Sequence, residues 1–299
     1  MTGPGGAAVT GRLARLTGSG VSDLRLTGSA HQCRHYRATL ADGRSVFVKA
    51  ADAGSAAVFG AEARGLAWLA EAGAAPAPEV LGWDDGLLAI AWVPPGAPDA
   101  AAAERFGWEL AGTHAAGAAR FGAPWPGFIA SLPLDNDAPG GSGASGGDDW
   151  PDWYAGRRLL PFLRRAAGTG ALGPAQVRDV EAVIARIGRL AGPAEPPSRI
   201  HGDCWSGNVL WSGGRGWLID PAAHGGQRET DLAMLALFGA PFLDRILGSY
   251  HEAAPLADGW RSRVPLHQLH PLLVHACLFG SGYAGPVAGA ARAALRAET

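Results

Sequence analysis

The sequence is poor in lysine and carries no block of like charge. Lys49 is the only lysine among 299 residues, and the formal net charge is −2. A nucleic-acid-binding function would need a basic stripe or patch, which this chain lacks, so we expect no nucleic-acid partner. Because arginine supplies every other permanently cationic side chain, a sole lysine at the end of an apolar segment is a candidate functional residue.

Cysteines and long apolar runs are also scarce. Cys33, Cys204 and Cys277 are odd in number and widely spaced, which predicts neither a disulfide framework nor a zinc site. No run is long and apolar enough to span a bilayer, and no signal-peptide core follows the N-terminus. Apolar residues make up 47% of the chain, a globular composition. We expect a soluble cytoplasmic protein with free thiols, no membrane partner and a monomeric state.

The most informative stretch is HGDCWSGNVL at residues 201–210, followed by WLIDP at residues 217–221. Asp203 can accept the proton of an attacking hydroxyl, and side-chain oxygens of Asn208 and Asp220 suit Mg²⁺. The interval from Asp203 to Asn208 is that of the kinase catalytic loop. Asp220 stands where kinases place a metal-binding aspartate.

Two short apolar segments flank the pair Gly213 and Gly214, which predicts a β-hairpin. Such a hairpin would hold Asn208 and Asp220 close together, facing one ion. Taken singly, each polar residue is better explained as ordinary loop chemistry. The full set at this spacing, with a lysine upstream, favours phosphoryl transfer.

The N-terminal third predicts a small antiparallel sheet. Polar and apolar residues alternate over 24–27, 35–40 and 45–49, and the third of these strands ends at the lysine. Gly28 and Ser29 would form the turn at the first bend of this meander.

Helical periodicity follows the third strand. A helix is predicted over 55–73, with Glu62 in its middle, and the continuous apolar run over 87–93 predicts a buried strand. Another helix is predicted over 99–119. Asp231 is expected to satisfy free N–H groups at the start of a later helix.

The runs His201 to Asn208, Ile219 to Pro221 and Gln227 to Met234 resemble the fructosamine kinase (ketosamine-3-kinase) family. That family is a branch of the aminoglycoside-phosphotransferase-like kinases. The patterns HGDxWSGN and RETDLAM are typical of this branch, whereas aminoglycoside and choline kinases share only HxDxxxxN and the later aspartate. A run from Leu269 to Tyr283 also matches, so the resemblance extends from about Gly28 to Tyr283.

The resemblance implies an α+β, two-lobed protein-kinase-like fold. Residues 1–93 would form a small antiparallel-sheet N-lobe that binds nucleotide, and residues 94–299 a larger, mainly helical C-lobe for catalysis and substrate binding. ATP would lie in the cleft between them. The backbone of Ala91, Trp92 and Val93 would form the hinge that hydrogen-bonds adenine, although the family more often has an acidic residue where Ala91 stands.

The resemblance also implies roles for N-lobe side chains. Lys49 would contact the nucleotide phosphates, and Glu62 would pair with it and hold it in place. Gly28 and Ser29 would lie in the loop that covers the phosphates. The structural alternatives are a solvated surface glutamate and a plain hairpin turn.

The implied reaction is ATP-dependent phosphorylation of a sugar hydroxyl, the 3-hydroxyl of a ketosamine, which is a sugar joined to an amine. Asp203 would deprotonate that hydroxyl while Asn208 and Asp220 hold Mg²⁺. Two alternatives remain: an aminoglycoside or choline-like phosphotransferase of the same fold, and a non-catalytic nucleotide-binding module. The intact set of polar residues argues against the second. The lack of an acidic cluster in the second lobe, outside the Gly/Ser-rich stretch at 135–149, argues against an aminoglycoside acceptor.

Overall fold

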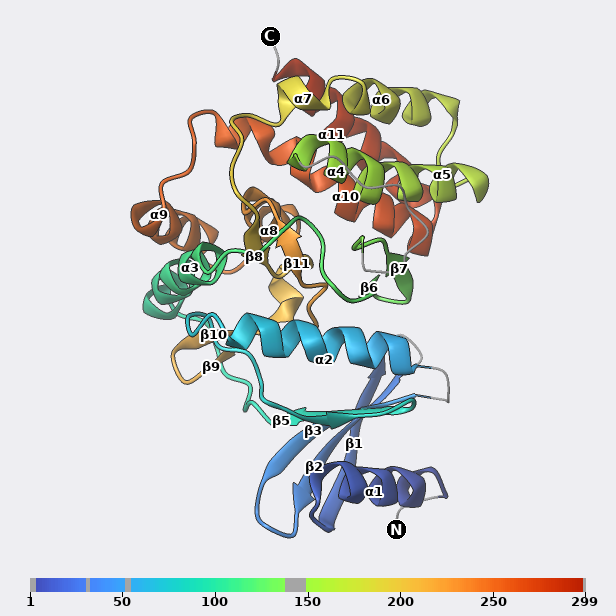
Figure 1. The fold of residues 1–299 in the computed structure, drawn as a ribbon, viewed down its shortest axis with the longest axis vertical. Coiled ribbons are helices and arrows are strands. Elements are labelled where there is room, and N and C mark those ends of the chain that lie inside the picture. Colours follow the sequence, from blue (N-terminus) through green and yellow to red (C-terminus); the bar gives the residue numbers. More distant parts are fainter. Residues whose placement is uncertain (1–3, 31–32, 52–54, 138–148, 298–299) are drawn as a thin grey trace.

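The computed structural model describes residues 4–30, 33–51, 55–137 and 149–297. Its N-terminal lobe is a five-stranded antiparallel sheet with strand order β1-β2-β3-β5-β4 (Figure 1). The strands are β1 (Val21–Ala30), β2 (Cys33–Leu40), β3 (Ser45–Ala50), β4 (Val80–Trp83) and β5 (Leu87–Ala91). Helices α1 (Pro4–Thr17) and α2 (Ala56–Ala70) complete the lobe.

The two helices cover opposite faces of the sheet, because successive residues of a strand point to opposite sides. Leu87 and Ala89 of β5 share one apolar cluster with Leu13 of α1. Leu88 and Ile90, the alternate residues of β5, pack instead with side chains of α2. Figure 1 shows the consequence: α2 lies between the sheet and the second lobe, while α1 lies on the far side. The three predicted strands of the meander are confirmed, and the predicted helix over 55–73 and strand over 87–93 form but end earlier, at Ala70 and Ala91.

The predicted position of the first bend is wrong. Gly28 and Ser29 lie inside β1, where they pair with His35 and Arg34 of β2, and residues 31–32, which join the two strands in the sequence, lie outside the described residues. The register shifts between Leu26 and Gly28. Glycine inside a strand often marks such an irregularity, so the signal was a bulge and not a turn.

The second lobe is mainly helical, as predicted. Its helices are α3 (Ala100–Ala115), α4 (Trp150–Tyr154), the π-helical turn η1 (Ala155–Leu159), α5 (Leu160–Gly168), α6 (Pro174–Ile184), α7 (Ile187–Leu190), the 3₁₀ turn η2 (Ser206–Asn208), α8 (Glu229–Leu237), α9 (Leu243–Ala253), α10 (Trp260–Phe279), the 3₁₀ turn η3 (Ser281–Tyr283) and α11 (Ala284–Arg296). No helix in the described part of the chain is long and apolar enough to cross a membrane.

Helix α3 follows the chain segment that leaves β5, and its ends have clear causes. The Asp99 carboxylate accepts a hydrogen bond from the Ala102 N–H at 2.8 Å, which caps the first turn. Gly117, with φ of +68°, adopts the left-handed conformation that terminates helices. The helix is therefore shorter than the predicted span of 99–119. The lobe boundary predicted after Val93 falls in the segment between β5 and α3 and stays a prediction.

Three two-stranded ribbons carry the loops of the second lobe that face the sheet. They are β6 (Gly127–Ile129) with β7 (Leu132–Leu134), β8 (Ser198–Ile200) with β11 (His224–Gly226), and β9 (Val209–Ser212) with β10 (Arg215–Leu218). The predicted hairpin is β9–β10, and its turn residues Gly213 and Gly214 both have positive φ, 57° and 70°. Two left-handed residues in succession favour the turn type that joins adjacent antiparallel strands.

Candidate functional site

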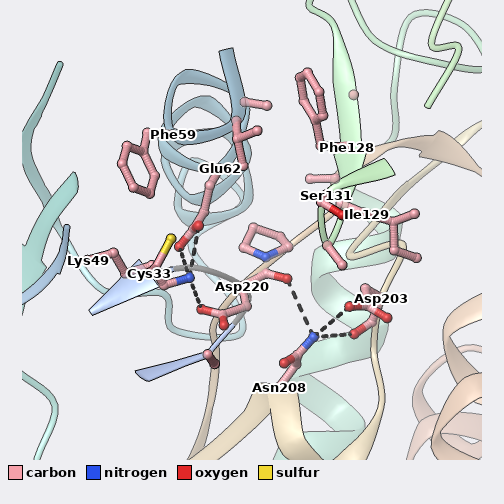
Figure 2. Close-up of a pocket in the computed structure, with 18 of the residues that line it drawn as sticks. Cys33, Lys49, Phe59, Glu62, Phe128, Ile129, Ser131, Asp203, Asn208 and Asp220 are labelled. Atoms are coloured by element: carbon pink, nitrogen blue, oxygen red, sulfur yellow. Dashed lines mark hydrogen bonds and ion pairs between the residues drawn. The ribbon is translucent and has the colours of Figure 1, made fainter. Parts of the chain in front are cut away.

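A cavity of about 640 Å³ separates the two lobes and is lined by residues of both. The N-lobe contributes Lys49 from β3 and Glu62 from α2, and the C-lobe contributes Asp203, Asn208 and Asp220. Figure 2 shows these five side chains facing one another across the cleft. Residues separated by more than 150 positions in the sequence therefore meet in a single site.

Lys49 lies on the N-lobe side of the cavity. Its Nζ is 2.8 Å and 2.9 Å from the two carboxylate oxygens of Glu62 and 2.8 Å from Oδ1 of Asp220 (Figure 2). Burial by itself lowers the pKa of this ammonium, but the charges of the two carboxylates outweigh burial and raise it above its usual value. Lys49 is therefore a fixed positive charge at the point where the sheet faces the second lobe.

Asp203 and Asn208 form the other half of the polar cluster. The Asn208 Nδ2 donates to the Asp203 carbonyl and to its Oδ2, both at 2.9 Å, and lies 3.4 Å from the Asp220 carbonyl. Burial, together with the nearby charges of Asp220 and Asp231, raises the pKa of Asp203 to about 8, although the hydrogen bond from Asn208 lowers it. A carboxylate with its pKa near neutrality is suited to accept a proton.

His201 connects the loop that carries Asp203 with the strand end that precedes Asp220. Its Nε2 lies 2.9 Å from the Ile219 carbonyl, and its Nδ1 accepts the Asp203 N–H at 3.2 Å. Burial lowers the pKa of this imidazole, so the neutral form, with Nε2 protonated, satisfies both contacts. The ring thereby fixes the loop of Asp203 against the residue that precedes Asp220.

Asp231 was expected to satisfy N–H groups of its own helix, and here the structure corrects the prediction. The N-cap residue of α8, Arg228, makes no side-chain cap hydrogen bond, and the Glu229 N–H donates to the Gln227 side chain. The Asp231 carboxylate instead accepts from the backbone N–H groups of His201 at 2.7 Å and Gly202 at 2.9 Å, and from His114 Nε2 at 3.1 Å. Asp231 is fully buried, so these contacts fix the start of the Asp203 loop from within the core.

The predicted glycine-loop and hinge residues, Gly28, Ser29, Ala91, Trp92 and Val93, are not among the described residues that line the cavity. Ala30 and Cys33 line the cavity, whereas Gly28 and Ser29 lie farther back along β1 and are not among its lining residues. Gly28 and Ser29 therefore precede, along β1, the first residue that lines the cavity, Ala30.

The backbone of the predicted hinge, Ala91 to Val93, forms hydrogen bonds with neighbouring segments of the N-lobe. The Ala91 N–H donates to the Glu79 carbonyl at 2.8 Å, and the Trp92 N–H donates to the Ser45 carbonyl at 3.0 Å. Two of the three N–H groups predicted to form the hinge, those of Ala91 and Trp92, are therefore already bonded to other backbone carbonyls of the N-lobe. The role of this segment in adenine recognition stays a prediction.

Trp205 is a cavity residue that the sequence patterns did not single out. It lies in the loop between Asp203 and Asn208 and lines the cavity with 39% of its surface exposed. Its ring packs over Gly207, where an added Cβ would lie 2.2 Å from the indole. The ring edge contacts Phe238, at 5.9 Å between centroids. Its position in the sequence, between the predicted site residues Asp203 and Asn208, is the signal that could have identified it.

A second set of unpredicted lining residues comes from the β6–β7 ribbon. Phe128, Ile129 and Ser131 close the cavity on the side of Asp203 (Figure 2). Ala130, at the tip of this ribbon, has φ of +50°, which is uncommon for a residue with a side chain. The ribbon also approaches α2, so it bridges the two lobes above the cleft.

The family model for fructosamine kinase matches residues 19–296 of this chain. The chain belongs to the fructosamine kinase family. A protein named probable ketoamine kinase from Thermus thermophilus is 36% identical over 246 residues, which cover 80% of this chain and 83% of that protein. Membership of the family makes the chain an ATP-dependent kinase that phosphorylates a hydroxyl group of a sugar-amine compound.

Solved structures agree with this placement. A structure assigned as a fructosamine-3-kinase from Thermobifida fusca superposes with a TM-score of 0.90 at 52% identity, covering 97% of this chain and 99% of that one. An aminoglycoside phosphotransferase in complex with gentamicin superposes with a TM-score of 0.62 at 14% identity, covering 100% and 99% of the two chains. That likeness concerns the fold alone, which is the predicted two-lobed protein-kinase-like fold.

Proposed function

We propose that this kinase transfers the γ-phosphoryl group of ATP to the 3-hydroxyl of a ketosamine. The observation that supports it best is the placement of Asp203 and Lys49 on opposite sides of one cavity. Phosphate groups would lie against Lys49, and the acceptor hydroxyl against Asp203. Positioning and electrostatic stabilisation account for most catalysis of phosphoryl transfer, and this cavity supplies both.

Asp203 would act as the base in this reaction. Its carboxylate takes the proton of the acceptor hydroxyl as the oxygen bonds to the γ-phosphorus and the bond from phosphorus to the bridging oxygen of ADP breaks. Lys49, held by Glu62 at 2.8 Å, would neutralise charge on the phosphates. The loop geometry set by Asp231 would keep Asp203 at the acceptor oxygen while the bond forms.

Asn208 and Asp220 would hold Mg²⁺. The Asn208 amide nitrogen already donates to Asp203, which leaves its carbonyl oxygen as a ligand, and Asp220 is 42% exposed to the cavity. Mg²⁺ in kinases is held by only one or two protein oxygens plus the phosphates, so a pair of oxygen donors fits it. When bound, the ion neutralises and orients the phosphates.

The acceptor side of the cavity favours a sugar over a polycation. Trp205 and Phe128 present aromatic surface beside Asp203, and Ser131 adds a hydroxyl. Sugar rings pack well on aromatic faces, which combine apolar area with little loss of side-chain entropy. The carboxylates among the described lining residues are those of Glu62, Asp203 and Asp220, and all three have roles at the phosphates or the acceptor hydroxyl. An aminoglycoside, which carries several ammonium groups, would find no further acid there.

The aromatic surface continues beyond Trp205. Phe238 packs against His275 in a tilted arrangement at 5.0 Å between centroids, and His275 contacts Phe279 and Tyr283 at 5.4 Å and 5.0 Å. Phe238 and Phe279 are 36% and 60% exposed. We place the amine portion of the ketosamine along this surface, since it is continuous with the wall of the cavity.

The test is ADP release from ATP and Mg²⁺ in the presence of fructosyl-lysine, with the Asp203→Asn variant as the control. Asn keeps the size of the side chain and cannot take a proton, so turnover should fall by about 10²- to 10⁴-fold while the ATP-dependent rise in melting temperature persists. Structure determination of the product by NMR would identify the phosphorylated hydroxyl.

Acceptor competition decides between the proposed substrate and its alternatives. Turnover with kanamycin or choline in place of fructosyl-lysine would reject the ketosamine assignment and retain the kinase. ATP binding with no turnover on any of these acceptors would instead favour a non-catalytic nucleotide-binding module.

A further inference from the structure

Helix α2 carries Glu62, yet its C-terminal end belongs to the core of the second lobe. Leu69 at the end of α2 and Ala75 just beyond it share an apolar cluster with Phe106 and Leu110 of α3. At Gly65 an added Cβ would lie 3.2 Å from Ala223, which shows how closely the helix approaches the chain after Asp220. The sheet side of α2 holds it in the N-lobe, and its other end is anchored across the cleft.

One arginine forms the most direct part of this anchor. Arg199 lies in β8, the strand that leads into the Asp203 loop, and its Nη1 donates to the Trp68 carbonyl in the last turn of α2. That carbonyl needs a partner, because the Ala72 N–H, which would reach it in a continuing helix, donates to the Leu69 carbonyl instead.

The same guanidinium packs on the Trp68 side chain. Its Cζ lies 4.5 Å from the centre of the Trp68 ring, and its Nη1 is 3.7 Å from Glu71. The Trp68 ring in turn contacts Trp125, just before β6, edge to face at 5.7 Å. A cation at the C-terminal end of a helix also interacts favourably with the helix dipole.

A second anchor follows the helix. Arg215 of β10 donates to the Ala74 carbonyl at 3.0 Å, and the Leu218 N–H donates to the Pro76 carbonyl at 2.8 Å. The strands that end before Asp203 and before Asp220 thus both bond to the end of α2 or to the segment after it. Glu62, Asp203 and Asp220 are thus held in place by two arginine-to-backbone hydrogen bonds and one backbone–backbone hydrogen bond between their segments.

We propose that Arg199 is a positioning residue for phosphoryl transfer. Through Trp68 it holds α2, and with it Glu62 and Lys49, in register with the loop that carries Asp203. Glu62 and Trp68 are six residues apart, about 9 Å along the helix, so a shift at Trp68 is carried along a rigid element to the ion pair. This inference rests on the proposed phosphoryl transfer and adds a residue that contacts neither ATP nor acceptor.

The experiment is a double-mutant cycle of Arg199→Met and Glu62→Gln, read by kcat for ADP release with fructosyl-lysine. Arg199→Met keeps the aliphatic stem and removes the donors, and we expect about a ten- to hundredfold fall in kcat from the misplaced ion pair. In the Glu62→Gln background the same change should cost less than threefold, because both act on one pair. Losses that multiply in the double variant, or an unchanged kcat in Arg199→Met, would overturn the proposal.

Two further variants keep the test interpretable. Arg199→Lys retains charge and reach without the planar group that covers Trp68, so it should recover part of the activity, and it carries the cycle if the Met variant does not fold. Arg245→Met removes an exposed arginine whose partner is Glu104, and its kcat should match the wild type.

The proposed function can fail independently of this inference. Wild-type protein that releases no ADP with fructosyl-lysine would reject the acceptor. The cycle would then be read from Mg-ATP affinity by thermal shift, where the same non-additive pattern is expected because Lys49 meets the phosphates. Additive effects on ATP affinity would reject the role of Arg199 alone.

Discussion

The two sides of the cavity are lined by different kinds of side chain, charged on one side and aromatic on the other. On the proposed nucleotide side, Lys49, Glu62 and Asp220 are joined by contacts of 2.8 Å to 2.9 Å. On the proposed acceptor side, Trp205 and Phe128 offer aromatic surface, and Trp205 is 39% exposed. The first side is a closed network of charges, and the second is an open apolar wall.

The difference shows what each side must achieve. Every ATP molecule presents the same phosphates, so a fixed arrangement of charge suffices to bind them. Acceptors differ in shape, and discrimination among them depends on which surfaces they cover. Variants on the two sides should therefore separate effects on kcat and on ATP from effects on the acceptor KM.

The largest effect is expected from Lys49→Met, on the nucleotide side. Loss of the ammonium removes an electrostatic stabiliser of the transferring phosphates, for which a fall in kcat of about 10²- to 10³-fold is typical. It also leaves the buried Glu62 without its partner, a change that costs about 3 to 5 kcal/mol in comparable pairs. Steady-state kinetics and thermal melting measure the two effects.

The control for Lys49→Met is Arg44→Met, which breaks an exposed pair with Asp42 at the far end of the sheet. Its kcat should equal that of the wild type. An equal loss in both variants would mean that general destabilisation, and not the site, explains the Lys49 result.

The pH dependence tests the boundary between the two sides. With its pKa near 8, Asp203 is mostly protonated at pH 6, so kcat/KM should rise about tenfold per pH unit up to pH 8 and then level off. Rate measurements across pH 6 to 9 at constant ionic strength give the curve. A flat profile over this range would contradict the role of Asp203 as base.

The same pKa has a consequence for stability with the opposite sign. The folded-state pKa near 8 lies above the unfolded value of about 3.9, so the folded chain holds this proton more tightly. The free energy of unfolding should therefore decrease as pH rises from about 4 to 8. Asp203→Asn removes this decrease, and its melting temperature should exceed that of the wild type more at pH 8 than at pH 5.

On the acceptor side, Trp205→Ala should raise the KM for fructosyl-lysine about tenfold, since a stacking contact is worth up to about 1.5 kcal/mol. The KM for ATP should stay unchanged. Trp108→Ala is the matched control, because Trp108 is 48% exposed and is not among the cavity-lining residues. A rise in the ATP KM with Trp205→Ala would contradict the claim that the two sides bind ATP and acceptor separately.

The smallest effect is expected from Gly207→Ala. The new Cβ would lie 2.2 Å from the Trp205 ring, so the indole must move without being lost. An acceptor KM raised by about threefold is consistent with a small overpacking cost. Gly289→Ala in α11 adds a methyl group to open space and should leave both KM values unchanged.

Local sequence signals predicted most elements of the fold. The β9–β10 hairpin followed from two glycines between apolar segments, and α2 from an apolar stripe of helical period. Gly28 and Ser29 were misplaced because a glycine can mark a bulge as well as a turn, and only the pairing with β2 distinguishes the two. Strand pairing depends on a partner elsewhere in the chain.

The contacts of the site also fall into two groups, those predictable from local spacing and those that depend on distant segments. The spacing of Asp203, Asn208 and Asp220 predicted that they would meet, since one hairpin joins them. The contacts of Asp231 with the His201 loop and of Arg199 with Trp68 were not predictable, because each joins elements whose approach depends on the packing of the whole lobe. Long-range contacts of this kind leave no periodic pattern in either segment.

The scarcity of lysine has a chemical consequence. Reducing sugars attach to accessible, unprotonated amines. The only side-chain amine of this chain, that of Lys49, is 8% exposed; burial alone would favour its neutral form, but two carboxylates keep it charged, with a raised pKa. An enzyme proposed to act on the products of amine glycation therefore offers sugars no lysine of its own to modify, and can work among them without becoming their target through its side chains.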